Sequence, residues 1–168
     1  MIIVFGAGIS GLGAVKLLES KGKEVALIDD KVSKLKTEDG LRFIEEKEIE
    51  YIVKSPGISF KSKLITKAME KNIPIYSEID IAYEYMDKNI EIIAFTGTNG
   101  KTTTCTKTYE LFKKAGFRVE LGGNVGKSYA EIVSENRDLD YIVLELSSYQ
   151  LEHSPRIKPK IAGIINLT

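Results

Sequence analysis

The chain has 168 residues, with 24 Lys and Arg against 24 Asp and Glu, one histidine and no tryptophan. This length allows one large or two small domains with a buried core, and a formal net charge of zero gives no long-range reason to expect a nucleic-acid or membrane-surface partner. The lone cysteine, Cys105, excludes an intrachain disulfide framework and a multi-cysteine metal site. The opening MIIVFGAGISG is too short and too rich in glycine for a signal peptide, and no apolar run approaches a membrane span, so we expect a soluble cytoplasmic protein.

The first half of the chain alternates short apolar runs with amphipathic stretches. Residues 2–5, 25–28 and 51–53 are the predicted strands, and helices are expected after the first strand and over residues 62–71 and 78–86. In the first helix Leu12, Val15 and Leu18 recur at helical spacing and predict its buried face. Strands that are apolar on both faces and separated by helices indicate a parallel sheet covered on both sides.

A second series of the same kind follows the polar segment 87–91. Its predicted strands are residues 92–95, 119–121, 141–146 and 161–165, and its predicted helices are residues 101–115 and 127–134. We therefore predict an α/β fold of two doubly wound, Rossmann-like units with mainly parallel sheets, spanning residues 1–88 and 89–168. The second unit is expected to be the amino-terminal part of a P-loop ATP-binding domain. The sequence stops directly after an apolar strand, which favours the front part of a longer protein and an exposed sheet edge that promotes self-association.

The first motif is Gly6-Ala7-Gly8-Ile9-Ser10-Gly11, a GxGxxG turn between a predicted strand and a predicted helix. Its glycines allow a tight turn and let backbone N–H groups approach a diphosphate at the helix N-terminus. Asp29 ends the next strand, where an acid can bind a ribose or a base. The pattern specifies a diphosphate-linked nucleoside, so NAD, FAD and UDP-sugars all remain open, as does a purely structural role of the glycines in packing.

The second motif is Thr96-Gly97-Thr98-Asn99-Gly100-Lys101-Thr102-Thr103, a Gly-rich turn that leads into a helix. Such a turn surrounds nucleotide phosphates with N–H groups, Lys101 offsets charge near the β and γ phosphates, and the Thr102 hydroxyl is a ligand for Mg²⁺. The usual pattern has a glycine where this chain has Phe95, so the P-loop is a shortened variant. Two phosphate-binding turns in one chain suggest an enzyme that joins a nucleotide-carried substrate to a second molecule at the cost of ATP.

A third cluster contains Gly122-Gly123-Asn124 and the stretch from Glu145 to Leu151. Ligands bind at the carboxyl ends of parallel strands, so Glu145 is expected to reach the same Mg²⁺ as Thr102. For Glu145 a surface or capping role is an equal alternative on the sequence alone. Asn124 is ambiguous as well, because asparagine tolerates left-handed turns.

Five stretches together resemble the Mur ligase family, in the family's order and across the whole chain. They are GAGISG (6–11), SPGIS (55–59), TGTNGKTT (96–103), GGNVG (122–126) and LELSSYQLE (144–152). TGTNGKTT is shared by several Mur ligases and by folylpolyglutamate synthase. ELSSYQL is the discriminating element, and it resembles the members that add D-glutamate to UDP-N-acetylmuramoyl-L-alanine in peptidoglycan synthesis.

The resemblance implies a role for each matching residue. Gly8, Ile9 and Ser10 would contact the diphosphate of the UDP-sugar, and Asp29 and Ser55 its uracil end. ATP would bind at Gly97, Thr98, Asn99, Gly100, Lys101, Thr102 and Thr103, with Thr102 and Glu145 on Mg²⁺ and with Lys101 and Glu145 as catalytic residues. Asn124, Ser147 and Gln150 would hold the muramoyl-alanyl part. ATP would convert the substrate carboxylate into an acyl phosphate, which the amine of D-glutamate then attacks.

The departures from the family pattern concern the rest of the metal site. The family has a metal-binding histidine shortly after an N-x-T turn, and this sequence stops at that turn, residues 166–168. A carboxylated lysine and a third domain also lie further on in the family. His153 does not match the metal-binding position and is expected to be solvated, and Cys105 is expected in the core. We therefore expect the 168 residues to be inactive alone.

Three alternatives remain open. The first is a different Mur ligase, one that adds L-alanine or a diamino acid. The second is an NAD-linked oxidoreductase fused to a nucleotide-binding module, and the third is a non-catalytic nucleotide-binding piece.

Overall fold

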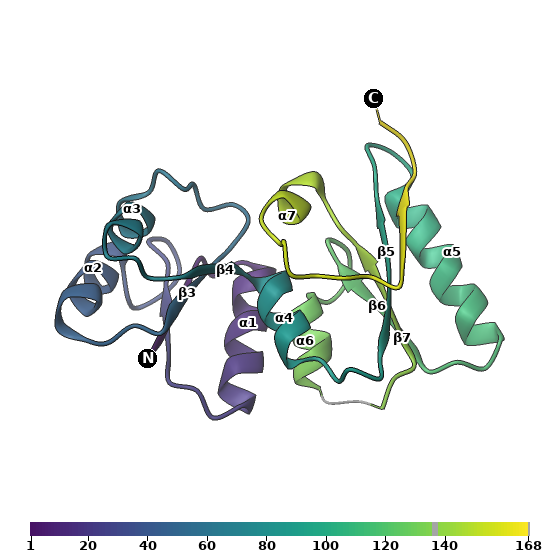
Figure 1. Ribbon diagram of the computed structural model, residues 1–168, viewed down its shortest axis with the longest axis horizontal. Helices are drawn as coiled ribbons and strands as arrows, with labels where there is room; N and C mark the ends of the chain where they lie inside the picture. The colour runs from purple at the N-terminus through teal and green to yellow at the C-terminus, as the bar shows by residue number, and fades with distance from the viewer. Residues whose placement is uncertain (136–137, 168) are drawn as a thin grey trace.

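The protein consists of two four-stranded parallel sheets, which follow each other along the chain (Figure 1). The computed structural model describes residues 1–135 and 138–167. The predicted α/β class with two parallel sheets is confirmed. No helix within those residues is both long enough and apolar enough to cross a membrane.

The first sheet has the strand order β2-β1-β3-β4. Its strands are β1 (Ile2–Phe5), β2 (Val25–Ile28), β3 (Tyr51–Lys54) and β4 (Ile75–Ser77). The register pairs Ile3 with Ala26 on one side and with Ile52 on the other. β1 is fully buried because it lies between two neighbours and is covered on both faces, as its unbroken apolar sequence predicts.

The second sheet has the strand order β6-β7-β5-β8. Its strands are β5 (Glu91–Thr96), β6 (Val119–Gly123), β7 (Tyr141–Glu145) and β8 (Ile161–Ile164). The parallel pairing of β5 and β7 places Phe95 opposite Glu145, so the P-loop turn and this carboxylate leave the sheet at the same edge. β8 is an edge strand, and its Ile161 and Ile164 are exposed.

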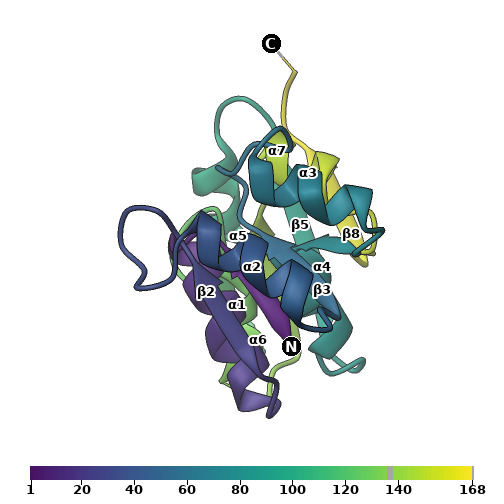
Figure 2. The ribbon, with the colours of Figure 1, turned by 90° about the vertical axis from the view of Figure 1, so that its left-hand side faces the viewer.

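Seven helices connect the strands of the described chain. They are α1 (Ile9–Ser20), α2 (Thr37–Glu46), α3 (Lys63–Glu70), α4 (Glu78–Tyr85), α5 (Lys101–Lys114), α6 (Tyr129–Ser134) and α7 (Ser148–Glu152). α2 and α3 cover the face of the first sheet that is turned away from the second (Figures 1 and 2). α5 covers the outer face of the second sheet, where Cys105 is fully buried as expected.

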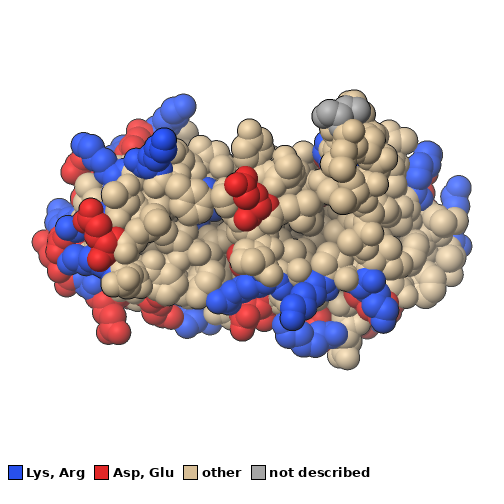
Figure 3. Space-filling model, turned by 45° about the horizontal axis from the view of Figure 1, so that its top comes forward, with Lys and Arg blue, Asp and Glu red and all other residues tan. Residues whose placement is uncertain are grey.

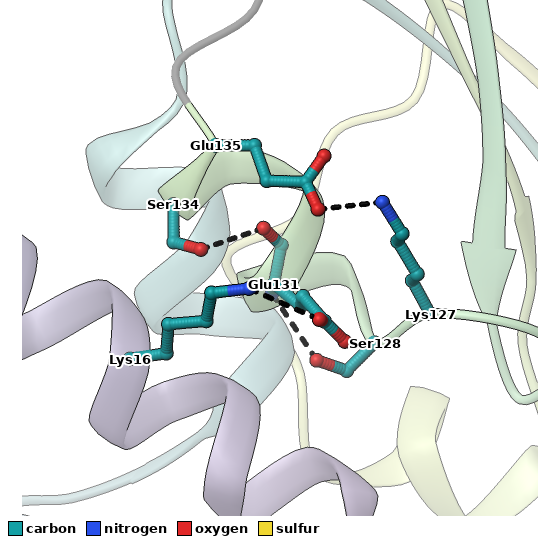
Figure 4. A network of polar contacts seen from close by, with 6 residues as sticks. All are labelled: Lys16, Lys127, Ser128, Glu131, Ser134 and Glu135. Atoms are coloured by element: carbon teal, nitrogen blue, oxygen red, sulfur yellow. Dashed lines mark hydrogen bonds and ion pairs between the residues drawn. The ribbon is translucent and has the colours of Figure 1, made fainter.

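α1, α4 and α6 form a layer between the two sheets and share one hydrophobic core with both (Figure 1). Gly13 of α1 lies so close to α6 that a Cβ there would be 1.9 Å from the Ser128 hydroxyl oxygen. The Ser128 hydroxyl accepts a hydrogen bond from Glu131 N, and Lys16 forms an ion pair with the Glu131 carboxylate at 3.1 Å (Figure 4). Because the core is continuous across this layer, the division at residues 88 and 89 remains a proposal.

Some predicted details differ in the structure. Of the predicted buried face of α1, Leu18 is fully buried and Val15 packs against the core, but Leu12 is 52% exposed; Ala14 and Leu17 complete the buried face instead. α2, β4 and α7 were not predicted from the sequence; β4 has three residues and α7 has five. The helix expected over residues 127–134 begins at Tyr129, where Ser128 caps it.

Candidate functional site

Both sheets direct the carboxyl ends of their strands toward the same side of the molecule, the top in Figure 1. Figure 3 shows this side, with charged side chains gathered mainly along its margins and a hollowed middle. Ligands of open α/β sheets bind at this edge, where loops replace the strands. Two sets of predicted residues lie here, one over each sheet.

An open hollow of about 570 Å³ lies over the first sheet. Its walls are the glycine turn with Gly8, Ile9 and Ser10, the end of β2 with Asp29, and the SPGIS loop with Ser55. The structure therefore brings together all five residues that were predicted for the UDP-sugar. Gly8 has no atom within 4 Å of an added Cβ, so its backbone is open to the hollow. Gly11 serves packing, because a Cβ there would lie 1.8 Å from Gly6 O.

Asp29 ties the walls of this hollow together. Its carboxylate accepts hydrogen bonds from Ala7 N at 2.9 Å, Lys31 N at 2.8 Å and Val32 N at 3.0 Å. These bonds, that from Ala7 first, lower the pKa of Asp29 from its ordinary value. A carboxylate offers about four acceptor positions, so one remains for a ligand. Ser55 is committed similarly, because its buried hydroxyl donates to Gly6 O at 3.0 Å.

Over the second sheet, Glu145 joins the P-loop helix to the GGNVG turn. The Thr102 hydroxyl donates to Glu145 Oε2 at 2.8 Å, and the Asn124 side-chain amide donates to Glu145 Oε1 at 3.1 Å. Asn124 N also donates to Glu145 O at 2.8 Å. Glu145 is only 3% exposed, so a surface role is excluded, and three residues predicted from separate motifs meet at one point.

The donor set fits a magnesium ion. Mg²⁺ prefers oxygen ligands and is usually held by one or two carboxylates, several waters and the phosphates of a nucleotide. Thr102 and Glu145 provide such oxygens, and the hydrogen-bond partners of Glu145 are neutral groups, which leave its negative charge for a cation. Within the described residues no group of three or more His, Cys, Asp or Glu side chains is arranged to hold a metal by itself.

Lys101 begins α5 and folds over the P-loop. Its ammonium donates to Gly97 O at 2.7 Å and to Thr98 O at 3.1 Å, so the positive charge lies directly above the turn. Gly100 has φ +81 and caps the helix, which directs the amides of the first turn toward the same space. Gly97, Thr98, Asn99, Gly100 and Thr103 lie in this turn and at the start of α5, and their contacts with a nucleotide remain a prediction.

Ser147 and Gln150 bind each other at the start of α7. The hydroxyl and the backbone N–H of Ser147 both donate to Gln150 Oε1, and Gln150 N donates to the Ser147 hydroxyl at 3.3 Å. This is a capping box, which explains why a helix begins in this short polar stretch. The predicted substrate contacts of both residues remain a prediction, and they require polar atoms that the box already uses in part.

The sequence did not identify a second, smaller cavity of about 30 Å³ next to Gln150. Lys54, Phe60, Glu78 and His153 contribute to its lining. His153 packs on the ring of Phe60 with centroids 4.7 Å apart and its side chain is 32% exposed, so the histidine that was expected to be solvated is only partly so. Lys54, which directly precedes SPGIS at the end of an apolar strand, is the sequence feature that could have pointed to this cavity.

Comparison with known proteins agrees with these motifs. Residues 95–168 match the model of the Mur ligase middle domain. The whole chain is similar to curated proteins called UDP-N-acetylmuramoylalanine–D-glutamate ligase. That of Fusobacterium nucleatum is 42% identical over 98% of this chain, and that of Bacteroides fragilis is 41% identical over 99%. The chain spans 38% and 40% of the length of these two relatives.

Solved structures confirm the fold. The UDP-N-acetylmuramate:L-alanyl-gamma-D-glutamyl-meso-diaminopimelate ligase of Neisseria meningitides superimposes with a TM-score of 0.65 and 17% identity, over 99% of this chain and 60% of its own. The UDP-N-acetylmuramate-alanine ligase of Thermotoga maritima does so with a TM-score of 0.53 and 20% identity, over 99% and 41%. At this identity the likeness concerns the arrangement of the two sheets.

Proposed function

Because this chain belongs to the Mur ligase family, we propose that it supplies the UDP-sugar and ATP sites of a cytoplasmic ligase of peptidoglycan synthesis. The proposed reaction adds D-glutamate to UDP-N-acetylmuramoyl-L-alanine through an acyl phosphate. Relatives about 40% identical over nearly the whole chain carry the name of that reaction, which favours it over the addition of L-alanine or a diamino acid.

One observation carries the proposal: the buried Glu145 carboxylate bridges the P-loop hydroxyl of Thr102 and the amide of Asn124. A helix cap or a packing role does not require a carboxylate at 3% exposure, because burying a charge is costly unless it binds a partner. A phosphate-binding turn and a buried acid at the end of a neighbouring parallel strand form the usual arrangement for a magnesium-bound nucleotide.

Each group has a defined task in this proposal. The amides at the start of α5 and the Lys101 ammonium bind phosphate oxygens, and Thr102 and Glu145 hold Mg²⁺, which neutralises charge on the phosphates when it is bound. Asn124 orients Glu145 by its two hydrogen bonds. Over the first sheet, the backbone at Gly8, Ile9 and Ser10 faces the diphosphate of the UDP-sugar.

The test is binding, because the chain spans about 40% of the length of its relatives. Isothermal titration with UDP-N-acetylmuramoyl-L-alanine, with ATP and Mg²⁺, and with NADH separates the alternatives. We expect the first two to bind at independent sites and NADH not to bind. Lys101→Met should weaken ATP binding and leave the UDP-sugar unaffected, whereas Gly8→Val should do the reverse.

Glu120→Gln is the matched control for these variants, because this residue of β6 is absent from both proposed sites. The proposal fails if NADH binds the hollow over the first sheet, or if neither ATP nor UDP-N-acetylmuramoyl-L-alanine binds. A phosphate-release assay with D-glutamate tests the separate expectation that the 168 residues do not turn over. Binding of UDP-N-acetylmuramate in preference to its L-alanyl form would favour the L-alanine-adding member.

The exposed edge strand β8 supports the remaining part of the proposal, self-association. Ile161 and Ile164 are 51% and 65% exposed on a strand that pairs on one side only. Unpaired edges with apolar side chains favour pairing with another chain. We expect an apparent mass by light scattering that rises with concentration, and a constant monomer mass would contradict this part.

A further inference from the structure

Asn166 lies against the P-loop, two residues after the end of β8. Its side-chain oxygen accepts hydrogen bonds from Thr98 N at 2.9 Å and from Asn99 N at 3.0 Å. Its side-chain amide donates to Asn99 O at 2.9 Å. Asn166 therefore binds both the backbone N–H and the backbone carbonyl of Asn99, as a neighbouring strand would.

The backbone holds Asn166 in this position. Ile165 N donates to Thr96 O at 2.9 Å, which extends the pairing of β8 with β5 up to the first residue of the turn. A Cβ on Gly97 would lie 3.1 Å from both N and O of Asn166, so the two segments are in close contact. Beyond the end of β5, the side chain of Asn166 thus continues the hydrogen bonding that the backbone of β8 makes with β5.

This arrangement divides the N–H groups of the P-loop into two sets. Those of Thr98 and Asn99 donate to Asn166, whereas the amides at the start of α5 are the unpaired donors of a helix N-terminus, where an anion binds. The Lys101 ammonium binds the carbonyls of the same turn, Gly97 O and Thr98 O. If Lys101 exchanges these carbonyls for phosphate oxygens, the contacts of Asn166 with Thr98 and Asn99 can remain in place.

We propose that Asn166 is a positioning residue for the nucleotide site, which braces the P-loop from outside and reserves the amides of residues 100–103 for phosphate. The proposal rests on the ATP site proposed above. It differs from a model in which the Asn166 oxygen occupies a phosphate-oxygen position and must leave when a nucleotide binds. The two models predict opposite effects of removing the side-chain amide.

Amide hydrogen exchange of the ¹⁵N-labelled chain tests the brace without any nucleotide. Asn166→Leu keeps a similar side-chain size but removes the acceptor, so the amide protons of Thr98 and Asn99 should exchange roughly tenfold faster than in the wild type. Asn166→Asp restores the acceptor and should restore slow exchange at both amides. Asn89→Leu, at an exposed asparagine between α4 and β5, is the matched control and should change neither.

Titration with ATP and Mg²⁺ tests the consequence. Asn166→Leu should raise the Kd for ATP roughly tenfold, because the turn that has lost this contact must be ordered when ATP binds. The melting temperature of the variant should stay within a few degrees of that of the wild type. In the wild-type complex, phosphorus couplings should appear at amides of residues 100–103 and be absent at Thr98 and Asn99.

Several outcomes overturn the proposal. They are unchanged exchange at Thr98 and Asn99 in Asn166→Leu, ATP affinity that is equal or tighter in that variant, and phosphorus coupling at either of these amides. If the wild type binds no ATP, the proposed function fails, and the exchange measurement still decides whether Asn166 braces the turn.

Discussion

Glu78 is a buried carboxylate at the junction of the two sheets, and replacing it with glutamine should change the pH dependence of stability. The residue begins α4, is 2% exposed, and accepts a hydrogen bond from Ala130 N at the start of α6. Burial raises the pKa of Glu78 to about 7, and the hydrogen bond from Ala130 partly opposes this rise. Burial also raises the pKa of the neighbouring Tyr129, so that phenol stays neutral.

The sign of the effect follows from where the proton binds more tightly. Between about pH 4.5 and pH 7 the folded chain keeps the Glu78 proton while the unfolded chain loses it, so stability falls as pH rises through this window. The difference between the ordinary pKa of 4.5 and about 7, at about 1.36 kcal/mol per pKa unit, gives at most about 3 kcal/mol. Glutamine can accept from Ala130 N without ionising.

Urea unfolding followed by circular dichroism at several pH values measures this difference. Glu78→Gln should match the wild type near pH 4.5 and be more stable by about 1 to 3 kcal/mol at pH 8, with the gap opening between these values. Glu84→Gln, a largely exposed position on the same helix, is the control and should follow the wild type throughout. A constant gap between wild type and Glu78→Gln across the range would refute the reasoning.

Three further predictions concern other buried groups. Lys54 is 4% exposed and donates hydrogen bonds to Ser55 O and Ile58 O in the SPGIS loop. Lys54→Met should loosen this loop and weaken the binding of UDP-N-acetylmuramoyl-L-alanine about tenfold, as measured by calorimetry. ATP binding should be unchanged and is the control. Burial raises the pKa of the Cys105 thiol to about 11, so iodoacetamide at pH 8 should label it only in urea, and rapid labelling of the native chain would contradict this. Gly13→Val drives a side chain into Ser128 and should cost about 2 kcal/mol or more in urea unfolding, whereas Ser20→Val on the same helix should cost less.

The strands other than β4 and the two glycine turns could be predicted from the sequence because their signals are local. The buried strand β1 is a continuous apolar run, and the residues of each glycine turn are neighbours in the chain. α2 was missed although Leu41, Phe43 and Ile44 pack in or against the core of the first sheet, because its other residues are mostly polar. α7 was interpreted as a substrate motif, and the capping box of Ser147 and Gln150 shows that the same residues also form a helix start.

The shared core could not be predicted, because it depends on contacts between residues far apart in the sequence. Leu12 fits an apolar stripe on α1, but it is exposed in the structure. Which face of α1 is buried depends on its packing against α6, where Lys16 contacts Glu131, a residue 115 positions later in the chain. Asn166 likewise contacts Thr98 and Asn99 from 68 and 67 residues away, and only the β5–β8 register places it there.

Several candidate site residues share a property that limits what motifs alone can decide, because they also make structural contacts. Asp29 holds the glycine turn through Ala7 N, Ser147 and Gln150 cap α7, and Glu145 ties α5 to the GGNVG turn. A polar group that is already bonded and ordered pays little further entropy when it meets a ligand, so structural use favours binding. Its substitution, however, disturbs fold and affinity together. Paired measurements of stability and binding on each variant are therefore needed to separate the two contributions, as designed above for Asn166.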